Sequence, residues 1–261
     1  MARRTRPLAK RLFFRGVEAI TGGGVATAAW PISGRPSPNF RCVPAMKFEA
    51  ARRSMIDSQL RPNKVTDQPL LDAMAVIPRE EFVPAAYHSV AYVDEDVPLG
   101  NGRFLLEPMV LARLVQAAAP ARADRVLDVG SATGYGAAIL AGLASEVVGL
   151  EFDGALADRA NALLAARGIG NAMVLQGPLE QGVPPRAPFN AIVIEGLGDF
   201  VPPMLFDQLA DGGRLAAIVR DRGVGRAMIY SRSAGVVSAR ALFDASVAPL
   251  PGLQREAGFV F

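Results

Sequence analysis

The chain reads VLDVGSATGYG at residues 126–136 and continues as AAILA at residues 137–141. An apolar run closes on Asp128, a glycine-containing loop follows, and small apolar residues come next. A buried parallel strand reaches the N-terminus of a helix through such a tight turn, at the crevice where open α/β sheets bind their cofactors. The stretch therefore predicts an α/β fold with a cofactor site at this loop.

The spacing of the glycines bears on the kind of cofactor. A dinucleotide-binding loop reads G-x-G-x-x-G, and its second glycine lets the backbone approach a pyrophosphate, but Ala132 occupies that position. The pattern D-x-G-x-x-x-G favours a ligand without phosphate, such as S-adenosylmethionine. Glu151 supports this interpretation, because it ends the next apolar run and a carboxylate there can accept hydrogen bonds from both ribose hydroxyls. An ordinary strand–turn–helix with a glycine bend stays open as the alternative.

The composition is that of a globular chain, since 51% of its 261 residues are hydrophobic and 20% are charged. The formal net charge of +3 hides an uneven distribution. Residues 1–45 contain eight Lys or Arg and one acidic residue, whereas the rest contains 20 Lys or Arg and 24 Asp or Glu. The mildly acidic body lacks the basic patches that phosphate contacts need, so we expect no nucleic-acid partner.

Cys42 is the only cysteine and His88 the only histidine of the chain. This excludes an internal disulfide and argues against a metal site built from these residue types. A Ser-His-Asp triad would have to use His88, which we expect at the surface or in a loop. No apolar run reaches the 18 residues of a membrane span. We therefore expect no metal, no membrane association and a cytoplasmic location, while the oligomeric state is left open.

Residues 1–45 differ from the rest of the chain in having basic pairs, a run of three glycines and prolines at 31, 36, 38 and 44. A secretory signal and an organelle transit peptide are two interpretations. Glu18 and the glycines interrupt the apolar stretch that a secretory signal needs. We expect instead a disordered basic tail, with Met46 as the natural beginning. The expected organisation is then a tail (1–45), a helical, substrate-side segment (46–120) and a Rossmann-like cofactor domain (121–261).

Apolar periodicity predicts strands and helices that alternate from residue 126 onward. Helices are expected over 48–60, from a cap at Thr66 to Ile77, and over 107–119, 134–144, 154–167 and 200–210. Strands are expected over 126–130, 146–151, 172–176, 189–195 and 213–219, followed by a hairpin-like pair over 226–232 and 236–243. The stretch from Pro78 to Gly102 is expected to be a connector. This alternation implies a doubly wound, mostly parallel sheet.

Several motifs, in the same order, resemble the protein-L-isoaspartate (D-aspartate) O-methyltransferase family, most clearly between Met55 and Val219. The matching segments are QLR (59–61), AM (73–74), IPREEFVP (77–84), AY (91–92), PLGNG (98–102), the loop at 126–136, APFNAI (187–192) and QLADGGRL (208–215). The resemblance implies a Rossmann-like, S-adenosylmethionine-dependent enzyme that methylates the carboxylate of L-isoaspartyl residues in damaged proteins. Its partner would be a protein or peptide carboxylate.

The family's motifs also imply which residues form the site. The expected cofactor-binding residues are Asp128, Gly130, Ser131, Ala132, Thr133, Gly134, Tyr135, Glu151, Gly177 and Glu195. The expected catalytic positions are Arg103, Leu106 and Glu107.

The chain departs from the family where acceptor chemistry is expected. The family's Q-T-I-S-Q-P becomes RFLLEP at 103–108, which places Leu106 at the serine position. Its G-D-G becomes GPL at 177–179, and its T-A becomes Glu195 and Gly196. Arg103 is a candidate bidentate ligand for a carboxylate, with a solvated arginine beside a loop as the alternative. Pairing of Arg103 with Glu107 or Glu195 would relieve their repulsion of an anionic acceptor.

The acceptor decides what the site must supply. A carboxylate is ionised at neutral pH and needs no general base, so that transfer depends on in-line positioning and exclusion of water. A hydroxyl or amine acceptor would need a base, and Glu107, Glu195 and Asp94 are candidates. Two further hypotheses stay open: a diverged methyltransferase with another acceptor, and a non-catalytic module that binds S-adenosylmethionine.

Overall fold

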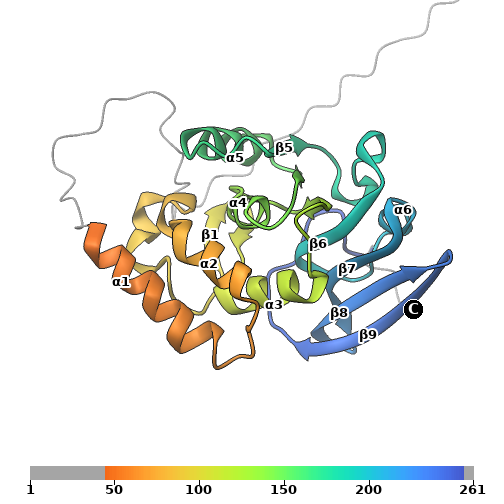
Figure 1. Cartoon of the computed structure of the whole chain (residues 1–261), viewed down its shortest axis with the longest axis horizontal. Helices are drawn as coiled ribbons and strands as arrows, with labels where there is room; N and C mark the ends of the chain where they lie inside the picture. Colours follow the sequence, from red (N-terminus) through yellow and green to blue (C-terminus); the bar gives the residue numbers. More distant parts are fainter. Residues whose placement is uncertain (1–44, 256–261) are drawn as a thin grey trace, which may run out of the picture. The chain divides into compact units, whose positions relative to one another are not determined.

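The computed structural model describes residues 45–255 of the chain (Figure 1). The tail expected over residues 1–45 therefore lies outside the described residues, apart from its last residue, and so does Cys42.

The core of the fold is a seven-stranded sheet with the order β5-β4-β3-β6-β7-β8-β9. Its strands are β3 (Arg125–Val129), β4 (Glu146–Glu151), β5 (Ala172–Gln176), β6 (Phe189–Gly198), β7 (Leu209–Asp221), β8 (Val224–Ser233) and β9 (Val236–Asp244). The five neighbouring strands β5, β4, β3, β6 and β7 are parallel to one another. Strand β8 pairs antiparallel with β7, and β9 pairs antiparallel with β8. The α/β class, the mostly parallel sheet and the C-terminal hairpin predicted from the sequence are confirmed. The order reverses between β3 and β6, the point at which open α/β sheets bind ligands.

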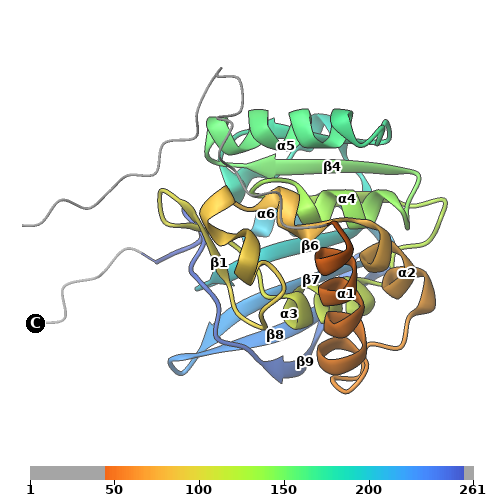
Figure 2. The ribbon, with the colours of Figure 1, turned by 90° about the vertical axis from the view of Figure 1, so that its left-hand side faces the viewer.

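The two faces of the sheet bury different partners, because side chains alternate along each strand. The helices beyond residue 100 are α3 (Pro108–Ala118), α4 (Tyr135–Ala141), α5 (Gly154–Ala166) and α6 (Pro203–Asp207). Helices α3, α4 and α5 pack on the face that carries Val126. Helix α6 and the C-terminal residues Leu250 and Leu253 pack on the face that carries Leu127. In Figure 2, α5 and α4 are seen above and below β4, which is itself a strand of the sheet.

The N-terminal part of the described chain is helical. Helix α1 (Ala45–Met55) continues into a π-helical turn (Ile56–Leu60), and α2 (Gln68–Val76) follows. The predicted cap at Thr66 is wrong. Asp67 caps α2, its Oδ1 accepting a hydrogen bond from the backbone N of Leu70 at 2.9 Å, while the backbone N of Thr66 donates to Oε1 of Gln116 at 2.7 Å.

The connector expected up to Gly102 contains structure that the periodicity did not indicate. Short 3₁₀ turns (Arg79–Phe82 and Ala85–Val90) precede a hairpin of β1 (Val97–Gly100) and β2 (Arg103–Leu105). Asn101 and Gly102 form its turn with φ of 49° and 71°. Asn-Gly is the dipeptide favoured where a two-residue turn needs two positive φ values. The hairpin matters because it carries Arg103 to the edge of the large sheet.

The helix predicted over 200–210 is too long. It spans only Pro203–Asp207, and β7 begins at Leu209. Proline lacks a backbone N–H and is tolerated only in the first helical turn, so Pro202 and Pro203 set the start of α6. The expected domain boundary at residue 120 stays a prediction.

Candidate functional site

Three carboxyl groups meet at the carboxyl ends of neighbouring strands. Strand β3 pairs in parallel with both β4 and β6, which sets Asp128 beside Gly149 and Val193. Glu151 and Glu195 each follow two residues further along those strands. All three acidic side chains are buried.

The loop after β3 lies at the carboxyl ends of these strands and leads into α4. Its first residue, Gly130, has φ of 81° and donates its N–H to the carbonyl of Leu150 at 2.7 Å. Gly134 has φ of 85° and immediately precedes α4. A Cβ at Gly134 would lie 2.9 Å from the Cβ of Ala160. Both positions therefore favour glycine because their φ angles are positive, and Gly134 also because Ala160 leaves no room for a side chain.

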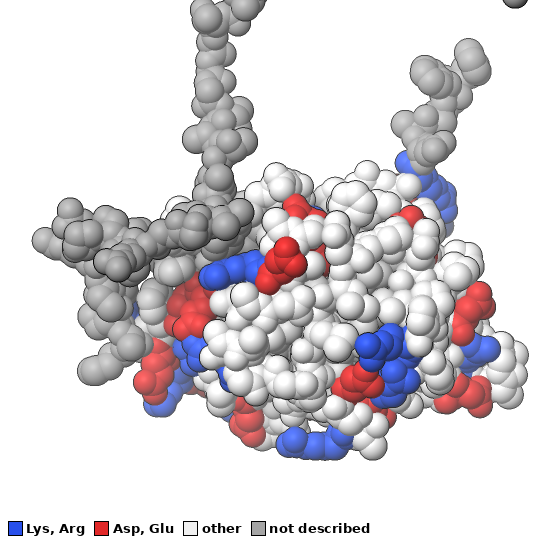
Figure 3. Space-filling view, turned by 90° about the horizontal axis from the view of Figure 1, so that it is seen from above, with Lys and Arg blue, Asp and Glu red and all other residues white. Residues whose placement is uncertain are grey.

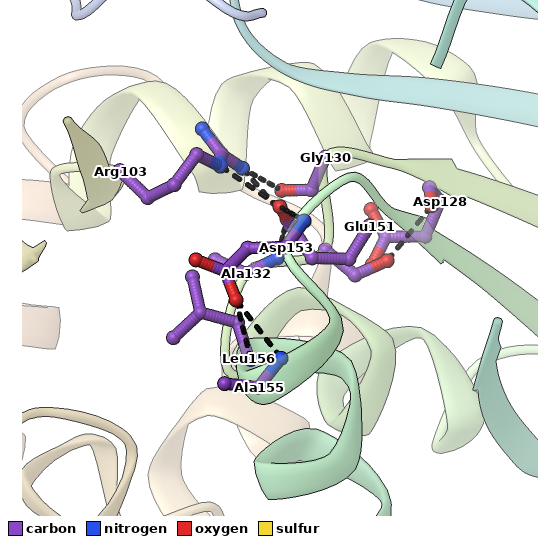
Figure 4. A network of polar contacts seen from close by, with 9 residues as sticks. Arg103, Asp128, Gly130, Ala132, Glu151, Asp153, Ala155 and Leu156 are labelled. Atoms are coloured by element: carbon purple, nitrogen blue, oxygen red, sulfur yellow. Dashed lines mark hydrogen bonds and ion pairs between the residues drawn. The ribbon is translucent and has the colours of Figure 1, made fainter. Parts of the chain in front are cut away.

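Arg103 reaches from β2 across the glycine loop to Glu151 (Figure 4). Its Nε donates to Oε1 of Glu151 at 3.0 Å and its Nη2 to Oε2 at 2.8 Å, while Nη2 also donates to the carbonyl of Gly130 at 3.0 Å. The side chain of Arg103 is 3% exposed and that of Glu151 is 0% exposed. The interpretation of Arg103 as a solvated arginine is therefore wrong. Pairing with Glu107 or Glu195 is also wrong, because the hairpin directs the guanidinium to the end of β4.

Glu151 receives two further hydrogen bonds from the backbone. The N–H of Ala132 donates to Oε2 at 2.7 Å and the N–H of Asp153 to Oε1 at 3.1 Å. Each carboxylate oxygen thus accepts two hydrogen bonds. A carboxylate offers about four acceptor positions in all, so every position on Glu151 is in use.

The carboxyls of Asp128 and Glu195, unlike that of Glu151, lack hydrogen-bond donors around them. Both oxygens of Asp128 and Oε1 of Glu195 are buried and accept no hydrogen bond from a donor group among the described residues, and the two carboxyls lie within hydrogen-bond reach of each other. Burial raises the pKa of the Asp128 carboxyl to about 6. Burial, and then the charge of Asp128, raises the pKa of Glu195 well above its ordinary value. Two close carboxyls in a low dielectric do not both ionise readily, so a proton shared between them satisfies the pair.

The remaining side chains of the loop anchor it to its surroundings. The hydroxyl of Ser131 donates to the carbonyl of Asp128 at 2.8 Å, and the hydroxyl of Thr133 donates to the carbonyl of Phe82 at 2.6 Å. Tyr135 is fully buried, with its ring 5.4 Å from that of Phe82. The loop is therefore held in one shape by contacts on both sides.

Leu106 and Glu107 lie just beyond the hairpin. The side chain of Leu106 is buried in the apolar cluster, and its carbonyl accepts a hydrogen bond from Nη2 of Arg79 at 2.7 Å. Glu107 is partly buried and directly precedes α3. Burial, followed by the charges of Asp94 and Asp96, raises the pKa of Glu107 to about 7.

Gly177 follows β5 at the same edge of the sheet. Its N–H donates to the carbonyl of Glu151 at 3.0 Å. The structure thus brings the expected cofactor-binding residues together around one strand edge and adds Arg103 to them. The side chain of Leu106 is directed into the core instead.

Leu250 was missed by the sequence-based reasoning. It is fully buried, and its Cδ2 lies 2.9 Å from the place that a Cβ on Gly130 would take. It also packs on Gly196, and its N–H donates to the carbonyl of Leu197 at 2.8 Å. The C-terminal segment therefore covers the glycine loop. Its local sequence carries no motif that would have indicated this.

Charge and metal-ligand chemistry are unremarkable elsewhere in residues 45–255. Acidic and basic side chains are interspersed on the face drawn in Figure 3. No group of three or more His, Cys, Asp or Glu that would suit a metal ion occurs among the described residues. A helix long and apolar enough to cross a membrane is likewise absent from the part of the chain that was described.

Similarity to known proteins agrees with this geometry. Residues 50–254 match the model of the family described as Protein-L-isoaspartate(D-aspartate) O-methyltransferase. A protein-L-isoaspartate O-methyltransferase of Koribacter versatilis is 40% identical over 207 residues, which cover 79% of this chain and 93% of that protein. Protein-L-isoaspartate O-methyltransferase 1 of Rhodopseudomonas palustris is 40% identical over 210 residues, covering 80% and 86%.

Solved structures show the same fold at lower identity. A protein-L-isoaspartate O-methyltransferase superposes with a TM-score of 0.70 at 23% identity, covering 78% of this chain and 67% of that one. A putative enzyme of this type from Plasmodium falciparum, in complex with S-adenosyl-L-homocysteine, gives 0.65 at 19% identity, covering 78% and 98%. The family match over most of the chain and the two relatives at 40% identity decide the assignment. The chain belongs to the protein-L-isoaspartate(D-aspartate) O-methyltransferase family.

Proposed function

We propose that the protein transfers the methyl group of S-adenosylmethionine to the carboxylate of L-isoaspartyl residues in damaged proteins. Membership of the family supports the reaction, and the buried carboxyls of Asp128 and Glu195 support the cofactor. S-adenosylmethionine carries a sulfonium and an ammonium group. Two buried acids that receive no hydrogen bond from the rest of the described chain, beside a glycine loop, suit such a cationic ligand.

The carboxyl ends of the parallel strands offer a partner for each part of the cofactor. Asp128 and Glu195 would face its cationic end, and Glu151 would accept its ribose hydroxyls. The glycine loop, with Ser131, Ala132, Thr133 and Tyr135, would hold its shape around the ligand, and Gly177 would lie beside the base. When bound, S-adenosylmethionine supplies an electrophilic methyl group.

The acceptor side can work without a general base. An acceptor carboxylate is already ionised at neutral pH. With a pKa of about 7, Glu107 carries a proton in a large fraction of molecules at that pH. Next in sequence to Leu106, it would supply to the acceptor the hydrogen-bond donor that the family's serine provides. The buried side chain of Leu250, which lies against the glycine loop, would help to exclude water.

The test is methyl transfer to a synthetic isoaspartyl peptide, with the same peptide containing ordinary Asp as the control acceptor. A base-labile methyl ester should form on the isoaspartyl peptide alone, and Glu151→Gln should abolish it. If wild-type protein binds S-adenosylmethionine but esterifies neither peptide, another acceptor or a non-catalytic role replaces the proposal.

A protein or peptide is accordingly the proposed partner. The absence of a nucleic-acid partner and the cytoplasmic location expected from the sequence stay predictions.

A further inference from the structure

Arg103 and the ribose hydroxyls of the proposed cofactor require the same atoms. The guanidinium takes one acceptor position on each oxygen of Glu151. Backbone N–H groups of Ala132 and Asp153 take the other two. A ribose hydroxyl can bond to Glu151 only if one of these donors leaves.

The two kinds of donor differ in how easily they are removed. Ala132 belongs to the anchored glycine loop, and Asp153 caps α5 through its own carboxylate, which accepts from the backbone N of Ala155 at 2.9 Å. Moving either would disrupt the loop or the helix end. The guanidinium of Arg103, by contrast, is held only by its hydrogen bonds to Glu151 and to the carbonyl of Gly130, and it is the tip of a long side chain on a strand of three residues. The guanidinium is therefore the donor that gives way.

We propose that cofactor binding exchanges Arg103 from Glu151 to the carboxylate of the acceptor. This inference rests on the proposed function. In the free protein, Glu151 holds the guanidinium and keeps it from binding other anions. When ribose hydroxyls occupy Glu151, the guanidinium loses its partner.

A displaced guanidinium in this position needs a new anion, because a buried unpaired charge is strongly unfavourable. Asp128 and Glu195 would be occupied by the cationic end of the cofactor. The carboxylate of Asp153 also lies near Arg103, but it already caps α5 and accepts a hydrogen bond from Asn101. The carboxylate of the acceptor is then the anion left for Arg103, and a planar guanidinium suits it as a bidentate partner. The cofactor therefore binds first, and an isoaspartyl group binds well only to the loaded protein.

The first test is calorimetric binding of S-adenosylhomocysteine, adenosine and 2′,3′-dideoxyadenosine. Arg103→Met fills a similar volume but donates no hydrogen bond. It should tighten S-adenosylhomocysteine and adenosine by about tenfold or more, the effect of one hydrogen bond to a charged group. The affinity for 2′,3′-dideoxyadenosine, which has no ribose hydroxyls to bond to Glu151, should stay unchanged. Arg103→Lys should give an intermediate gain if Arg103→Met does not fold.

Arg125→Met is the matched control, because Arg125 pairs with Glu146 at 2.9 Å in a half-exposed ion pair at the other end of β3. It should leave all three affinities unchanged. Equal or weaker binding of adenosine to both folded Arg103 variants overturns the exchange. If neither wild type nor variants bind S-adenosylhomocysteine at millimolar concentration, the proposed function itself fails.

The second test measures coupling between the two ligands. Binding of the isoaspartyl peptide to wild-type protein should be at least about fivefold tighter with saturating S-adenosylhomocysteine than without it, within the usual range of such coupling. Arg103→Met should remove this difference. It should lower the affinity for the peptide and raise the affinity for S-adenosylhomocysteine. A purely structural role of Arg103 would weaken both ligands, which would refute the proposal.

Discussion

The side chain of Glu195 occupies the space that a side chain at position 136 would need. A Cβ placed on Gly136 would overlap Oε1 of Glu195. Gly136 therefore allows a carboxyl from β6 to lie against the first turn of α4.

We expect Gly136→Ala to destabilise the protein by about 1–3 kcal/mol, the usual effect of overpacking. A loss of stability would be diagnostic, because replacing a glycine within a helix by alanine ordinarily stabilises the protein. Gly170→Ala is the control, since a Cβ there meets nothing within 4 Å. Urea unfolding measures both. Equal stability of the two variants would show that Glu195 moves aside without strain.

Affinity for S-adenosylmethionine should rise with pH. A cationic ligand favours the ionised form of the Asp128–Glu195 pair. The charges of Arg103 and Arg79 also favour that form, whereas the charge of Glu151 opposes it. With the pKa of Asp128 at about 6, the dissociation constant should increase by up to about tenfold for each pH unit below 6. Calorimetry from pH 5 to pH 8 checks this. Glu195→Gln cannot share an acidic proton and should flatten the profile; an unchanged slope would contradict the assignment.

The same pair predicts how the ligand-free protein responds to pH. Raised pKa values mean that the folded state holds protons that the unfolded chain has already released. The contribution of this pair to the free energy of unfolding is therefore fully present below the ordinary carboxyl range and is lost as the pH rises through about 6. The loss should be on the order of 2 kcal/mol. Urea unfolding at pH 5 and pH 8 measures it, and Asp128→Asn should reduce the difference. Greater stability at pH 8 in that comparison would refute a shared proton.

Glu107 should set a pH limit on methyl transfer at saturating cofactor. If its protonated form donates to the acceptor, turnover falls as the pH rises through about 7. Glu107→Gln keeps an N–H donor and should hold its rate above pH 7, whereas Glu107→Ala should lose about tenfold or more. Rates on the isoaspartyl peptide between pH 6 and pH 9 test this. A wild-type fall that persists in Glu107→Gln would assign the titration to another group.

Local patterns predicted the sheet but not the contacts across it. The apolar runs around Asp128 and Glu151 located β3 to within one residue at each end and β4 at both ends, because buried parallel strands leave a continuous apolar signal. The partner of Arg103 lies 48 residues away in the chain. That pairing depends on the hairpin turn at Asn101 and Gly102, a signal that was present but lies between strands too short to show periodicity.

Packing of the C-terminal segment has a consequence for synthesis. Leu250 covers Gly130, and the backbone N of Ala248 donates to Oδ2 of Asp96 at 3.1 Å, across 152 residues of sequence. A nascent chain emerges N-terminus first. The glycine loop is therefore made long before its cover arrives. A chain released before Leu250 would lack the side chain that covers Gly130, so that assembly of the site depends on synthesis having passed Leu250.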